Sequence, residues 1–157
     1  HLGNDVDGSL RLLQEATLSN PNDPMAWLYS CVWSQMWGDS KDSVSEAENA
    51  LALSPLDPQR YYFEMMVATS CAANGKWLRA IQLCQSSLLK NRYHLPTIRT
   101  LVLSLYEAGQ VDEATKTAKM LRELHPSFRL SEYRATASKS PARMHMARVL
   151  QTLGFPE

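Results

Sequence analysis

Four histidines and three cysteines are the residues that could do acid–base or metal chemistry in this chain. His1 is terminal, His94 and His125 fall in predicted turns, and His145 lies in the last predicted helix. The motifs that would organise such residues for catalysis, among them His-Glu-x-x-His, Gly-x-Ser-x-Gly and a glycine-rich phosphate loop, are absent. We therefore expect no catalytic site, no metal site and no cofactor.

The cysteines are Cys31, Cys71 and Cys84, an odd number without a Cys-x-x-Cys pair, which favours neither a disulfide framework nor a zinc site. Cys71 and Cys84 take facing places in one predicted helix pair, so a disulfide between them is the alternative to two small buried thiols. We expect buried thiols in a reducing compartment. The cytoplasm is the expected location, with the periplasm as the alternative if a parent protein is membrane-anchored.

The balance of charge excludes several classes of partner. Lysine and arginine number 16, and so do aspartate and glutamate, which gives a formal net charge of zero. No basic excess favours direct contact with nucleic acid. No apolar run reaches the length of a membrane span.

Glycines and prolines divide the chain at a nearly constant spacing into helical segments. Gly75 and Gly109 stand thirty-four residues apart, as do Pro21 and Pro55, whereas the interval from Gly38 to Gly75 is thirty-seven. Apolar residues recur at three-to-four spacing between these breaks, and no stretch shows sustained alternation. A fixed period in this range is typical of stacked helical repeats.

We therefore expect one all-α domain over residues 1–157. Its parts are a half repeat over 5–20, repeats over 24–55, 58–92 and 95–126, and a short segment with a capping helix over 127–157. Ser140 and Pro141 supply the start signal of the last helix, as cap and first helical residue.

The register resembles the tetratricopeptide repeat, an antiparallel helix-pair solenoid. The matching residues are an aromatic and small residues where helices approach, with prolines closing the pairs: Trp27, Cys31, Ala47, Pro55, Ala68, Ala80, Ala114, Ala118 and Pro126. Valine and cysteine stand at some glycine places of the pattern, which affects fine packing and leaves the architecture unchanged.

This resemblance implies a non-catalytic module that binds a protein or peptide on the concave face of its first helices. The candidate partner-binding residues counted from the register are Leu28, Val32, Gln35, Met36, Tyr62, Met65, Met66, Thr69, Arg99, Leu103 and Tyr106. Ordinary helix packing is the alternative for each apolar member. Replacing Leu103 or Tyr106 by Glu is expected to abolish partner capture and leave helicity unchanged.

A narrower resemblance rests on Ser-Pro-Leu-Asp-Pro at 54–58, Gly-Lys-Trp-Leu-Arg-Ala-Ile at 75–81 and the terminal Leu-Gly-Phe-Pro-Glu. These look like the C-terminal repeat regions of bacterial signalling proteins that carry a nucleotide cyclase or ToxR-type winged-helix domain. It implies that the chain is the regulatory or sensor part of a larger protein. The alternative is a self-association module that forms a homodimer through Trp33, Trp37 or the terminal helix.

Overall fold

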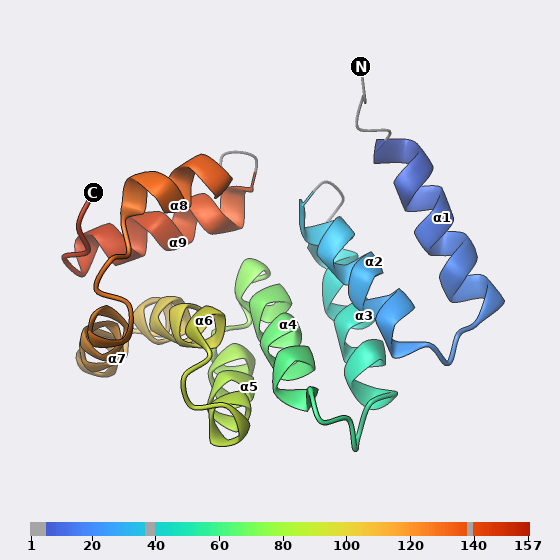
Figure 1. Ribbon diagram of the computed structural model, residues 1–157, viewed down its shortest axis with the longest axis horizontal. Coiled ribbons are helices and arrows are strands. Elements are labelled where there is room, and N and C mark those ends of the chain that lie inside the picture. Colours follow the sequence, from blue (N-terminus) through green and yellow to red (C-terminus); the bar gives the residue numbers. More distant parts are fainter. Residues whose placement is uncertain (1–5, 37–39, 138–139) are drawn as a thin grey trace.

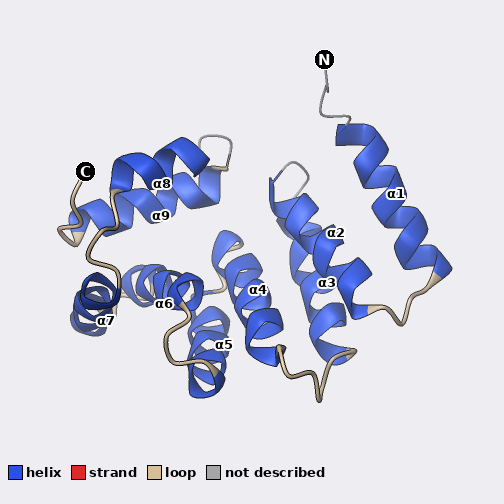
Figure 2. Ribbon diagram, viewed as in Figure 1, coloured by secondary structure: helices blue, strands red, loops and turns tan. Residues whose placement is uncertain are grey.

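The computed structural model describes residues 6–36, 40–137 and 140–157 (Figure 1). These ranges are mostly helix and contain no strand (Figure 2). The helices are α1 (Val6–Ser19), α2 (Pro24–Met36), α3 (Ser40–Ala52), α4 (Arg60–Ala73), α5 (Trp77–Lys90), α6 (Leu95–Glu107), α7 (Val111–Leu124), α8 (Leu130–Ala137) and α9 (Pro141–Thr152). The all-α class predicted from the sequence is confirmed.

Consecutive helices form antiparallel pairs, α2 with α3, α4 with α5 and α6 with α7, and the pairs stack in chain order (Figure 1). The first helices are neighbours in this stack, since α4 contacts both α2 and α6. Helix α1 packs against α2 ahead of the first pair. The stack curves, so that the C-terminal hairpin faces α2 across α4 and α6 (Figure 1).

Two glycines end the first helices of the second and third pairs in the same way. Gly75 has φ +70° and Gly109 has φ +78°, a region that other residues adopt only under strain. After each glycine, the N–H of the next residue donates to the carbonyl five residues before it, at 2.8 and 2.9 Å. This pattern is the Schellman cap, so the glycine spacing reflects one turn used twice. Gly38, expected to end α2 similarly, lies outside the described residues.

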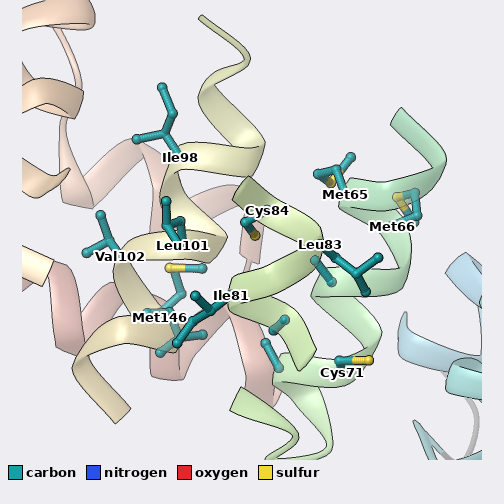
Figure 3. Packing of buried hydrophobic residues seen from close by; sticks show 14 of the residues in the cluster. Met65, Met66, Cys71, Ile81, Leu83, Cys84, Ile98, Leu101, Val102 and Met146 are labelled. Carbon is teal, nitrogen blue, oxygen red and sulfur yellow. The ribbon is translucent and has the colours of Figure 1, made fainter. Parts of the chain in front are cut away.

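Small side chains lie where paired helices approach each other. Ala68 on α4, Ala80 on α5 and Ala114 on α7 have no exposed surface, and Ala118 is 1% exposed. Cys84 takes a similar place on α5 and is fully buried. Figure 3 shows side chains of α4, α5 and α6 meeting in this core. Because larger groups would push the helix axes apart, these residues set the close approach of the pairs.

Helices α8 and α9 form a hairpin that closes the stack, with α9 in contact with α6. The ring of Phe128 meets that of Phe155 edge-on at 5.6 Å, and the N–H of Leu130 donates to the carbonyl of Pro156 at 2.9 Å. These contacts tie the end of the chain to the start of α8. Ser140 caps α9, accepting a hydrogen bond from a first-turn N–H at 3.4 Å, as the sequence predicts.

Candidate protein-binding groove

A groove of about 410 Å³ lies between the first helices of the pairs and the C-terminal hairpin. Its lining comes from α2, α4 and α6 on one side, which we call the repeat wall. The other side comes from α8, the residue that caps α9 and the first turns of α9, which we call the hairpin wall. Segments from distant parts of the chain build it together, because the stack curves back toward α2 (Figure 1).

The centre of the repeat wall is one stripe of α4. Tyr62, Met65, Met66 and Thr69 follow one another at intervals that keep them on one side of a helix, and all line the groove. Met65, Met66 and Leu103 of α6 are only 6, 8 and 5% exposed. The floor of the groove is therefore also part of the hydrophobic core.

The hairpin wall carries partly exposed residues beside a buried methionine. Tyr133 of α8 and Ala142 and Arg143 of α9 are partly exposed, whereas Met146 is 7% exposed and completes the apolar floor from this side. Ser140 also lines the groove. The same residue thus caps α9 and borders the groove, so the hydrogen bond that begins α9 also positions the first turn of α9 in the hairpin wall.

An aromatic ring joins the two walls through two arginines. The guanidinium carbon of Arg99 on α6 lies 5.7 Å from the centre of the Tyr133 ring, and that of Arg143 lies 5.2 Å from the same centre. Both distances are typical of cation–π contacts. Burial lowers the pKa of Arg99, and the charge of Arg143 lowers it further, while Tyr133 acts in the opposite direction.

Most of the residues predicted to bind a partner come together in this groove. Those lining it are Val32, Gln35, Tyr62, Met65, Met66, Thr69, Arg99 and Leu103. The remaining three differ: Leu28 is a core residue, 2% exposed, because α1, α3 and α4 surround α2. Tyr106 packs against the core outside the groove lining, and the side chain of Met36 lies outside the described ones. That any of them contacts a partner stays a prediction.

The repeat register does not predict the hairpin wall, since this wall lies after the last repeat. The available signal is the last helix, which is apolar on more than the one side needed for packing. Ala147 and Leu150 are fully buried, and Met146 adds a second apolar position that opens onto the groove. Nothing comparable in the sequence marks Tyr133 or Arg143.

All three cysteines are buried free thiols, so Cys71 and Cys84 form no disulfide. Burial raises the pKa of Cys31 to about 11 and also raises the pKa values of Cys71 and Cys84. A neutral buried thiol is a poor nucleophile. These residues are packing groups, as expected from the sequence.

The tryptophans predicted to mediate self-association lie in or next to α2. Trp33 is partly buried in α2, and Trp37 lies outside the described residues. Among the side chains that the structure describes, no three of His, Cys, Asp or Glu gather as metal ligands would. No helix in the described ranges has both the length and the apolar character to cross a membrane.

Solved structures of MamA share this fold. A structure titled as the crystal structure of MamA superposes with a TM-score of 0.70 at 16% identity, covering 95% of this chain and 86% of that one. MamA 41-end from Desulfovibrio magneticus RS-1 gives a TM-score of 0.70 at 14% identity, covering 96% and 84%. No family model and no curated protein matches the sequence. The likeness establishes the tetratricopeptide-like helical architecture.

Proposed function

We propose that this chain is a non-catalytic protein–protein interaction module that holds a segment of a partner in the groove between the repeat wall and the hairpin wall. The observation that supports it most strongly is the groove itself, an open concavity with an apolar floor and polar residues at its border. Helical repeat proteins usually bind their partners on concave surfaces of this kind, and small-molecule sites have a similar composition. Among the described residues of the groove lining there is no His, Cys, Asp or Glu, so the lining suits binding better than acid–base chemistry.

Selection from a phage-displayed random peptide library tests the proposal. Ala142→Trp would place an indole at the partly exposed mouth of the groove. Ala135→Trp makes the same change on the exposed side of α8, outside the groove. We expect the wild type and Ala135→Trp to retain the selected peptides and Ala142→Trp to lose them. Retention by Ala142→Trp, with helicity equal in all three proteins, would place binding elsewhere.

We also propose, from the sequence resemblance, that the module serves a regulatory role within a larger bacterial signalling protein. The supporting residues are those of the terminal and inter-repeat motifs, and the test is the full reading frame. An effector domain encoded with this chain is the expected finding, whereas a reading frame that encodes these repeats alone would contradict it. Sedimentation of the isolated chain separates partner binding from self-association, since the latter requires a concentration-dependent dimer.

A further inference from the structure

Two arginines line the groove, one on each wall. Arg99 projects from the repeat wall and Arg143 from the hairpin wall, and both lie against the ring of Tyr133. Two positive charges therefore border the same small region. They come from α6 and α9, which are separated in the chain by α7 and α8, so the fold, not local sequence, brings them together.

Arg99 has no acidic neighbour in the described lining of the groove. The lining contains neither Asp nor Glu among the residues that the structure describes. Arg99 makes no ion pair with a described residue, and its guanidinium group lies over the Tyr133 ring. A partly buried guanidinium that lacks a carboxylate has lost hydration without receiving a counter-charge.

The lowered pKa of Arg99 agrees with the lack of a carboxylate partner for this residue. Its pKa is lowered mainly by burial, Tyr133 partly opposes this, and the charge of Arg143 lowers the pKa further, so the surroundings disfavour the charged form of Arg99. An anion placed between the guanidinium groups would favour the charged form and offset this lowering. Carboxylates suit this place because the planar guanidinium donates two parallel hydrogen bonds to the two oxygens.

Next to the arginines the groove is apolar. Met65 and Leu103 on the repeat wall and Met146 on the hairpin wall form its floor. Methionine side chains adapt to different apolar groups. The two surfaces together fit a segment in which an acidic residue stands near apolar ones.

We propose that the part of the groove lined by Arg99, Tyr133 and Arg143 is the subsite for an Asp or Glu side chain of the partner segment, whose neighbouring apolar side chains lie on the methionine and leucine floor. This inference rests on the proposed function and names the chemistry of the partner. It predicts a charge preference that an apolar groove alone would not have.

Two peptide libraries that differ at one position test the subsite. Both are acetylated and amidated at their ends and randomised among apolar and small residues, with Glu fixed at the centre of one and Gln at the centre of the other. Binding is followed by fluorescence anisotropy. For the wild type we expect the Glu library to bind on the order of tenfold more tightly, the range of a charge-assisted hydrogen bond, and the preference to weaken as salt is added.

Three arginine variants test which residues produce the preference for the Glu library. Arg99→Gln and Arg143→Gln should each reduce it toward equal binding and leave affinity for the Gln library near that of the wild type. Arg148→Gln, an exposed arginine of α9 outside the groove lining, should keep it. Circular dichroism confirms that the variants remain folded.

The other outcomes separate the two proposals. Equal binding of both libraries by the wild type, lost in Ala142→Trp, would overturn the acidic subsite and keep the groove as the binding site. A preference that survives both Arg99→Gln and Arg143→Gln would place the subsite elsewhere. A third library, identical to the Gln library but with a free C-terminal carboxylate, controls for the chain end. Binding to this library alone would assign the arginines to a terminal carboxylate and contradict the side-chain proposal. No binding to any of the three libraries would contradict both proposals.

Discussion

The two walls of the groove differ in how much of the fold depends on them. Met65, Met66 and Leu103 of the repeat wall are also core residues, with at most 8% of their surface exposed. Tyr133 and Arg143 of the hairpin wall are partly exposed, and of the two only Tyr133 packs against the core, with its ring 5.7 Å from that of Phe128. A change in the first set alters folding and binding together, whereas a change at Arg143 mainly alters binding. The site should therefore be probed from the hairpin side.

The largest effect is expected when the repeat wall receives a charge. Leu103→Glu would place a carboxylate on a 5% exposed position, one helical turn from Arg99 on α6. Because one ion pair does not repay the desolvation of the carboxylate, the free energy of unfolding should fall by up to about 4 kcal/mol. The sequence alone predicts unchanged helicity for this variant, and the burial of Leu103 adds the prediction that its stability falls. Urea denaturation followed by circular dichroism measures it. A stability within about 1 kcal/mol of the wild type would show that the floor is not part of the core.

The next largest effect is expected when a contact that holds the C-terminal hairpin to the stack is removed. Phe155→Ala removes the ring that meets Phe128 at 5.6 Å and that carries the Arg122 guanidinium at 5.5 Å. We expect a loss of about 3 kcal/mol, the lower end for a buried phenylalanine, because the chain end can relax. Hydrogen exchange should rise in α8 and α9 and stay low in α4 and α5.

The control for this change is Glu157→Gln, which removes only the exposed ion pair with Arg134. Surface pairs of this kind contribute at most about 1 kcal/mol. Faster exchange spread evenly over all helices of the Phe155→Ala protein would mean that the hairpin and the stack unfold as one unit.

Alkaline pH should weaken the repeats and spare the hairpin, since the cysteines lie only in the repeats. The pKa of the Cys31 thiol is 9.0 when free and about 11 when folded, so the folded state holds this proton more tightly. Its contribution is complete below pH 9 and is lost between pH 9 and pH 11. The loss is about 2–3 kcal/mol by linkage.

Unfolding free energies of the wild type and of Cys31→Ala across this range isolate the contribution, because other groups titrate in both proteins. The wild type should lose stability more steeply than the variant. Parallel slopes would mean that the thiol is not protected by burial.

The smallest effect concerns the start of α9. Ser140→Ala removes the side chain that caps the helix and should cost about 1 kcal/mol. Peptide affinity should fall with it, since Ala142 and Arg143 lie in the first turn. Thermal unfolding and anisotropy titrations measure the two quantities, and Ser140→Asp, which keeps a capping oxygen, should restore the stability.

The sequence predicts the repeat wall and not the hairpin wall for a physical reason. Helical period and glycine caps are local, and they repeat, so the register places Tyr62, Met65 and Thr69 on one face before any tertiary contact is known. The same reasoning misplaces Leu28, because α2 is apolar nearly all round and its inner side is not distinguished by pattern. The meeting of Arg99 with Tyr133 and Arg143 depends on how far the stack curves, which no local pattern encodes.

Methionine methyl groups provide the most direct test of a groove shared by both walls. Met65 and Met66 report on the repeat wall and Met146 on the hairpin wall, whereas Met25 and Met120, each 38% exposed, lie outside the groove lining. Methyl NMR of carbon-13-labelled methionines, recorded while a peptide selected by the wild type is added, follows all of them together. The account predicts that Met65, Met66 and Met146 shift along one saturation curve while Met25 and Met120 stay in place. Shifts confined to Met25 or Met120, or to one wall, would contradict it.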